Sequence, residues 1–118
     1  MSFPEEQLWD EINQGWTLMS FTQRCLWEAI KRPPEEWELR GYGRCWVVAL
    51  IGSTVIYYNP FEHGFGLSPW SRYGLIERYE ASQYRLDEAV QRQLDIINTG
   101  CDIGPFGSQP TPGEYQKS

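Results

Sequence analysis

The stretch that decides the fold is Cys45-Trp46-Val47-Val48-Ala49-Leu50-Ile51-Gly52-Ser53-Thr54-Val55-Ile56-Tyr57-Tyr58. It places two runs of apolar, mostly β-branched and aromatic residues on either side of a Gly-Ser pair. Glycine takes a positive φ without steric cost, so this pair predicts a two-residue type II′ turn. The stretch therefore predicts an antiparallel hairpin in the middle of the chain.

The predicted turn also sets the register of the hairpin. Counting back from it pairs Ile51 with Thr54 and, further along, Val47 with Tyr58. In this register both faces of the hairpin carry apolar side chains, whereas a sheet with one face in water alternates apolar and polar residues. We therefore expect both faces to be covered, one by helices of this chain and the other by more helix, the C-terminal segment or a second chain.

Two helices are predicted before the hairpin. Each begins at a serine that is followed three residues later by Glu or Gln, which is the capping-box pattern: Ser2 with Glu5, and Ser20 with Gln23. Apolar residues at helical spacing follow both serines. We therefore expect two short amphipathic helices at the N-terminal end.

Glycine and proline mark where these helices are expected to end. Gly15 is predicted to end or bend the first helix, and Pro33-Pro34 to end the second. Residues 34–37 are expected to form one further helical turn. All of the strands are therefore placed after residue 43.

The second half of the chain predicts two more strands and one helix. Phe65–Ser68 is the third strand, with Pro69 at its end, and Leu75–Ala81 is a possible fourth. Ser82 is expected to cap a final helix that ends at Gly100. The expected fold is α+β, with an antiparallel sheet of three to four strands at about 44–81, two N-terminal helices and one C-terminal helix.

The length and composition predict one domain over residues 1–101. Residues 102–118 contain three prolines, three glycines and few aliphatic side chains. Such a segment buries too little apolar surface to offset its ordering entropy. We therefore expect a mostly disordered C-terminal tail.

The net charge is −6, and −5 of it lies in residues 1–38, which hold eight acidic and three basic residues. An acidic surface repels phosphate backbones, so nucleic acid is not an expected partner. The same surface would attract a basic protein. Solvated helix faces that keep the protein in solution are the alternative interpretation.

Six tryptophans are many for 118 residues: Trp9, Trp16, Trp27, Trp37, Trp46 and Trp70. A small domain uses large rings to fill its core. Tryptophan is also enriched among the residues that anchor protein interfaces. Both interpretations remain open from the sequence alone.

The cysteines and the N-terminal residues favour the cytosol. Cys25, Cys45 and Cys101 form no disulfide framework or CxxC motif, and Cys25 and Cys45 lie in apolar contexts typical of the core. The first residues lack the pattern of a signal peptide. No apolar run approaches the ~20 residues that a membrane span needs. We expect a cytoplasmic protein that does not contact membranes.

The sequence offers little catalytic chemistry. His63 is the single histidine, and a Cys–His or Ser–His site would have to use it. Neither metal-ligand spacing nor a phosphate-binding loop is present. We expect no catalytic residue, metal or cofactor, and a binding protein in preference to an enzyme.

Several short motifs resemble a set of small bacterial proteins of uncharacterised activity. They are Leu26-Trp27-Glu28-Ala29-Ile30, Pro34, Trp37, Trp46-Val47-Val48-Ala49, Gly52, Tyr58-Asn59, Glu62, Gly64-Phe65 and Ser71-Arg72-Tyr73-Gly74. The resemblance covers roughly residues 24–97. It implies a bacterial source and carries no functional residue over to this chain.

Three functions remain open. The first is a small acidic module that docks on a basic protein, either as toxin-neutralising immunity proteins do or in a regulatory role. The second is a small-molecule-binding protein or enzyme with an aromatic pocket around His63. The third is a subunit that is stable only as a homo-oligomer. The candidate ligand or partner residues are Trp46, Tyr57, Tyr58, Asn59, Glu62, His63, Phe65 and Trp70.

Overall fold

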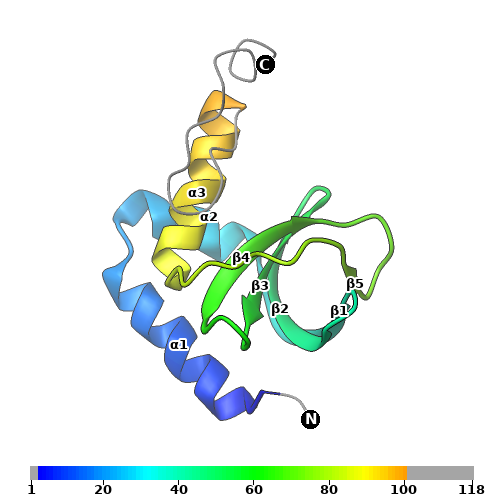
Figure 1. Cartoon of the computed structure of the whole chain (residues 1–118). Helices are drawn as coiled ribbons and strands as arrows, with labels where there is room; N and C mark the ends of the chain where they lie inside the picture. Colours follow the sequence, from blue (N-terminus) through cyan, green and yellow to red (C-terminus); the bar gives the residue numbers. More distant parts are fainter. Residues whose placement is uncertain (1–2, 101–118) are drawn as a thin grey trace.

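The structure is a computed structural model that describes residues 3–100. Three helices accompany one sheet (Figure 1). The predicted tail at 102–118 lies outside the described residues, as do Ser2 and Cys101. The elements are α1 (Glu5–Leu18), α2 (Phe21–Ile30), β1 (Lys31–Leu39), β2 (Gly43–Ile51), β3 (Thr54–Asn59), β4 (Gly64–Pro69), β5 (Leu75–Ile76) and α3 (Leu86–Thr99).

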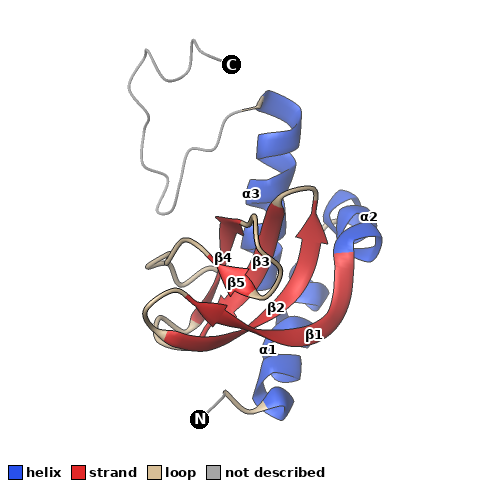
Figure 2. Ribbon diagram, turned by 90° about the vertical axis from the view of Figure 1, so that its right-hand side faces the viewer, coloured by secondary structure: helices blue, strands red, loops and turns tan. Residues whose placement is uncertain are grey.

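The sheet has five strands in the order β4-β3-β2-β1-β5. All neighbours are antiparallel except β1 and β5, which pair in parallel through Glu38 with Leu75 and Leu39 with Ile76. The sheet is strongly curled, and the helices lie on its outer side (Figure 2). The α+β class and the order of the helices are confirmed. The prediction of three to four purely antiparallel strands is wrong, because the sheet is mixed and has five.

The additional long strand is β1, which follows α2 without a loop. Residues 34–37 were expected to be helical, but they are extended and pair with β2. Prolines 33 and 34 hold this segment extended because proline fixes φ and disfavours helix in the residue before it. Trp37 and Leu39 then alternate with exposed residues, so one face of β1 is buried. This period of two is a strand pattern that the two prolines obscured.

The central hairpin forms at Gly52, whose φ of +56° is the positive value expected of the turn. The predicted pairs next to the turn are confirmed, from Ile51 with Thr54 to Ala49 with Ile56. Beyond Ala49 the register shifts, and Val47 lies opposite Tyr57 instead of Tyr58. The predicted register is therefore wrong past Val48, because one extra residue in β2 forms a bulge.

Both faces of the hairpin are buried, as expected. The helix-side cluster consists of residues from all three helices and one face of the sheet, including Leu8, Trp27, Val48, Tyr58 and Leu86. The other face is buried within the curl of the sheet, in a second cluster: Trp37, Leu39, Cys45, Val47, Val55, Tyr57 and Ile76. The second cover is therefore this chain's own strands. The apolar hairpin by itself gives no reason to require a second chain.

The segment predicted as strand Leu75–Ala81 is a strand only at Leu75–Ile76. The residues after β5 run across the sheet and are bound to it by side chains. The hydroxyl of Tyr57 donates to the Arg78 carbonyl at 2.8 Å and accepts from the Glu80 N–H at 2.9 Å. These side-chain hydrogen bonds hold the segment against the sheet in place of the backbone hydrogen bonds of a β-strand. Ser82 does not cap α3 but donates to the Phe65 carbonyl at 3.1 Å, and the N-cap of α3 is Arg85.

The ends of the helices agree with the sequence at some points. The capping box of Ser20 and Gln23 is confirmed, and α3 ends at Gly100 in the left-handed conformation. Pro4 is the N-cap residue of α1. Gly15 does not end α1, since the helix continues to Leu18. A Cβ on Gly15 would lie 2.6 Å from the Cβ of Leu86, so this glycine allows α1 and α3 to approach closely.

The helices in the described part of the chain are too short or too polar to cross a lipid bilayer.

Candidate functional site

The structure buries four of the eight residues expected to bind a ligand or partner. Tyr57 lies in the cluster inside the curl, whereas Tyr58 and Phe65 pack on the helix side with ring centroids 5.0 Å apart. Asn59 is fully buried and donates to the Glu80 carbonyl at 3.2 Å. These four side chains therefore stabilise the fold and do not face a common cavity.

The other four residues are more exposed but are dispersed. His63 lies in the turn between β3 and β4 with a φ of +57°, and its neighbour Glu62 accepts a hydrogen bond from the Tyr79 hydroxyl. The indole of Trp46 donates to the Phe3 carbonyl at 2.7 Å, and that of Trp70 donates to the Gly52 carbonyl at 3.2 Å. The structure thus does not assemble an aromatic pocket around His63.

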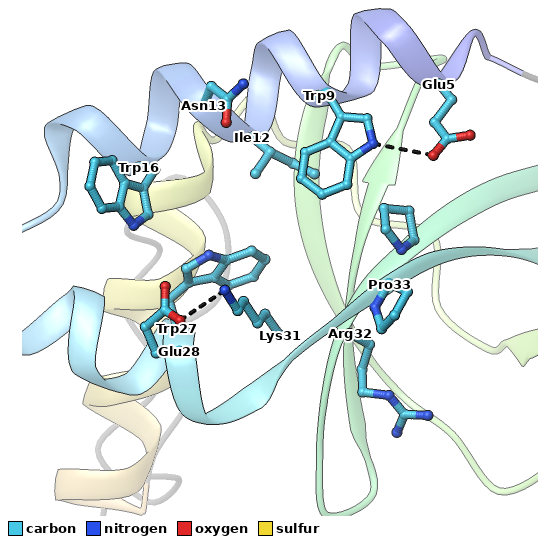
Figure 3. A pocket seen from close by; sticks show the side chains of 11 residues that line it. Glu5, Trp9, Ile12, Asn13, Trp16, Trp27, Glu28, Lys31, Arg32 and Pro33 are labelled. Atoms are coloured by element: carbon cyan, nitrogen blue, oxygen red, sulfur yellow. Dashed lines mark hydrogen bonds and ion pairs between the residues drawn. The ribbon is translucent and has the colours of Figure 1, made fainter.

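A cavity of about 600 Å³ lies elsewhere, between α1, α2 and the start of β1 (Figure 3). We call it the tryptophan groove. It is lined by Glu5, Trp9, Ile12, Asn13, Trp16, Trp27, Glu28, Lys31, Arg32, Pro33 and Pro34. None of the eight residues expected from the sequence is among them.

Helix α1 provides one wall of the groove. Trp9 and Trp16 are seven residues apart, about two helical turns, so they lie on the same side of the helix. Leu8, Ile12 and Gly15 form the buried stripe of α1, and the two tryptophans flank it. They are 42% and 39% exposed, respectively. Both rings extend from α1 toward α2 (Figure 3).

Trp27 of α2 forms the floor of the groove and is only 5% exposed. Indole N–H groups of tryptophan usually find a partner when the ring is buried. Four of the six tryptophans follow this rule: Trp9 donates to Glu5, Trp37 to Glu35, Trp46 to Phe3 and Trp70 to Gly52. Trp16 and Trp27 have no hydrogen-bond partner for this group among residues 3–100. Both tryptophans with an unpaired N–H therefore line the groove.

Trp16 also carries a cation on its ring. The guanidinium carbon of Arg24 lies 3.9 Å from the ring centroid. Arg24 donates to the Trp16 carbonyl at 3.2 Å and to the Thr17 carbonyl at 3.4 Å, so it also binds the C-terminal end of α1. A tryptophan ring beside this groove is therefore already shown to accept a stacked guanidinium.

The charges along the groove are separated. Helix α1 contains four carboxylates and no basic residue. On the opposite side, Lys31 pairs with Glu28 at 2.8 Å. Glu35 of β1 has its pKa lowered by hydrogen bonds from Trp37 and Tyr73 and further by the charge of Arg32. Of the four α1 carboxylates only Glu5 lines the groove, whose charged lining residues are therefore Glu5, Glu28, Lys31 and Arg32.

The lining of the groove is suited to binding. It offers indole rings, proline rings and N–H donors, but no serine, cysteine or histidine that could act as a nucleophile or as a histidine base. Among the described residues no three His, Cys, Asp or Glu side chains lie close enough to hold a metal ion. Of the cysteines expected in the core, Cys45 is buried, whereas Cys25 is exposed.

The chain matches no model of a protein family, no curated protein and no solved structure. The function is therefore inferred from the geometry of the groove. The sequence identified the tryptophans as a group but did not separate the groove tryptophans from those of the core. The available signal was the position of Trp9 and Trp16, two turns apart beside the buried stripe of α1.

Proposed function

We propose that this protein is a binding module that docks a partner protein in the tryptophan groove. The observation that carries the proposal is the pair of unpaired indole N–H groups of Trp16 and Trp27 in a groove with exposed rings. Neither N–H group is cut off from solvent, so a bound partner that supplies acceptors replaces water with direct hydrogen bonds, each worth about 0.5–1.5 kcal/mol. Tryptophan is also among the residues that contribute most to protein interfaces.

A partner protein is favoured over a small molecule by the surface beyond the groove. Leu18 is the last residue of α1 and Phe21 the first of α2, and they are 53% and 82% exposed. Exposed apolar surface beside a groove is typical of protein-interaction sites. A small molecule held in the groove would leave these two side chains unused.

The acidic N-terminal third favours a basic partner, because opposite charge accelerates encounter and selects against wrong partners. Such a module could act in the cytosol by occluding its partner, as immunity proteins do, or by regulating it. A second copy of this chain is the homo-oligomeric form of the same proposal.

A capture experiment tests the proposal. Immobilised full-length protein is exposed to extract of the source cells, and bound proteins are quantified by mass spectrometry. Trp9→Ala and Trp16→Ala should abolish capture of the partner. Phe61→Ala, which removes a more exposed ring from the turn between β3 and β4, should not. The proposal is wrong if every captured protein binds all four proteins equally.

The second candidate is a small-molecule site in the same groove. Its volume of about 600 Å³ is within the range of ligand pockets. A metabolite panel that raises the melting temperature of the wild type and not of Trp9→Ala would favour this function. If the increase in melting temperature is lost in His63→Ala and kept in Trp9→Ala, the ligand binds at the pocket around His63 that was expected from the sequence.

A further inference from the structure

We infer that the groove binds an extended, arginine-bearing segment of the partner, whose backbone carbonyls accept from Trp16 and Trp27 and whose arginine stacks on Trp9. This inference rests on the proposed function and adds the chemistry of the partner to it. Three separate features of the groove support it: the donors, the free ring and the charge of α1.

The first feature is the pair of donors. Trp27 is 5% exposed and Trp16 is 39% exposed, and the N–H of neither ring has an acceptor among the described residues. An extended peptide has backbone carbonyls that no internal hydrogen bond uses. It can therefore satisfy both donors from one strand of chain. A helical segment would offer such carbonyls only at its C-terminal end.

The second feature is the ring of Trp9, which is 42% exposed and donates its N–H to the Glu5 carboxylate at 3.2 Å. The hydrogen bond places a negative charge at the edge of an open aromatic face. A guanidinium stacked on that face can also donate to the carboxylate. Arg24 stacked on Trp16 shows the same pairing of guanidinium and indole within this molecule.

The third feature is the unbalanced charge of α1. Glu6, Asp10 and Glu11 make no ion pair or side-chain hydrogen bond with the rest of the described chain. These three carboxylates lie outside the lining of the groove, where Glu5 is the acidic residue of α1, and they add to the negative charge of the helix around it. Lys31 is paired with Glu28, and Arg32 extends away from α1 (Figure 3). A basic side chain from a partner that lies against α1 would therefore meet Glu5 on a helix with four carboxylates and no basic residue.

Arginine fits better than lysine because a planar guanidinium stacks on an indole and donates to a carboxylate at the same time. A proline-rich segment could also stack on the rings and supply carbonyls. Residues 105–112 of this chain have that composition. Such a segment would leave the Glu5 carboxylate beside Trp9 without a basic partner, so we take the arginine-bearing segment as the occupant.

The probe is the blocked peptide acetyl-Gly-Ala-Arg-Ala-Arg-Ala-Gly-amide, titrated into the full-length protein. The readouts are tryptophan fluorescence and the indole N–H resonances in a ¹⁵N–¹H spectrum. We expect the resonances of Trp16 and Trp27 to shift on binding. The same peptide with citrulline in place of arginine keeps the shape and loses the charge, and it should bind about tenfold more weakly. A lysine version should bind with intermediate affinity.

Matched variants locate the arginine. Glu5→Gln keeps an acceptor for the Trp9 N–H but removes the charge, so it should weaken the arginine peptide about fivefold and leave the citrulline peptide unaffected. Glu88→Gln on α3 removes an exposed carboxylate away from the groove and should change neither affinity. Trp16→Phe removes one donor and should weaken all of the peptides.

The inference is overturned if the citrulline peptide binds as tightly as the arginine peptide, or if a peptide of residues 105–115 binds more tightly than either. It is also overturned if the arginine peptide does not bind while Trp9 is still required for partner capture, and in that case the proposed function stands. If the arginine peptide does not bind and partner capture does not require Trp9, the proposed function is rejected as well.

Discussion

Glu80 and Arg92 form a buried ion pair that joins the segment after β5 to α3. The Arg92 Nη2 lies 2.7 Å from the Glu80 Oε2, and the two residues are only 5% and 4% exposed. The Glu80 Oε1 also accepts from the backbone N–H of Leu67 at 2.9 Å, and Arg78 lies 3.0 Å from the Oε2. One carboxylate therefore connects α3, β4 and the irregular segment.

Replacing one member of this pair should destabilise the protein strongly. Glu80→Gln leaves a buried guanidinium without its counter-charge, and such changes cost about 3–5 kcal/mol in the free energy of unfolding. Equilibrium unfolding in urea measures the loss. The double change Glu80→Gln with Arg92→Met should cost less than Glu80→Gln alone, because no buried charge remains and the introduced amide still offers an acceptor to the Leu67 N–H. The control is Glu28→Gln, whose partner Lys31 is exposed, and which should cost less than about 1 kcal/mol.

Gly15→Ala should destabilise the protein although alanine is the better helix former. In an exposed helix this change would stabilise by about 1 kcal/mol. Here the new Cβ would meet Leu86 at 2.6 Å from its Cβ and 3.0 Å from its nitrogen, so α1 and α3 would have to separate. We expect a net loss of about 1–3 kcal/mol in urea unfolding. Gln14→Ala, at the exposed neighbouring position of α1, should be neutral or stabilising; an equal loss there would refute this explanation.

Stability should fall at alkaline pH. Burial raises the pKa of the Cys45 thiol to about 12 and that of the Tyr58 hydroxyl to about 12, with smaller contributions from Glu38 and Glu11, and it raises the pKa of Tyr57 as well. The unfolded chain loses these protons first, at about pH 9–10. The stability that these groups contribute is therefore complete below about pH 8 and is lost as the pH rises toward 12.

Urea unfolding between pH 8 and pH 11 measures this loss. Each group should contribute a slope of up to about 1.4 kcal/mol per pH unit. Tyr58→Phe should reduce the slope above pH 10 by about that amount while changing the stability at pH 7 by less than about 1 kcal/mol. An unchanged slope in Tyr58→Phe would mean that this hydroxyl does not contribute.

The tryptophans should divide into two classes when each is replaced by alanine. Trp37 is 1% exposed at the centre of the cluster within the curl, and Trp37→Ala should cost about 3–5 kcal/mol. Trp9 is 42% exposed, and Trp9→Ala should cost no more than about 1–2 kcal/mol and keep the fold. Thermal unfolding followed by circular dichroism compares them. A loss at Trp9 as large as that at Trp37 would indicate a structural role for Trp9.

The sequence was sufficient where one local signal was strong. The turn at Gly52, the capping box at Ser20 and the end of α3 at Gly100 each depend on a few neighbouring residues, and each was predicted correctly. The prediction that both faces of the hairpin are buried was also correct, since it followed from their apolar side chains. β1 was missed because its two prolines indicate a helix end, while its alternation becomes visible only at Trp37 and Leu39.

The candidate site was not predictable in the same way. The sequence favoured the residues next to His63, but Tyr57, Tyr58 and Phe65 are core residues on two different faces of the sheet. The tryptophan groove depends on Trp9 and Trp16 meeting Trp27 from another helix. That meeting requires the close approach of α1 to α3 at Gly15 and the direct continuation of α2 into β1.

The amino-acid sequence by itself determined the helices, the central hairpin and the apolar character of both hairpin faces, because turns, caps and periodicity act over a few residues. Only the tertiary structure decided that the sheet curls to bury its second face, where the register shifts at Val48 and which tryptophans keep an unpaired N–H. Those features depend on contacts between residues distant in the chain, and no local pattern encodes them.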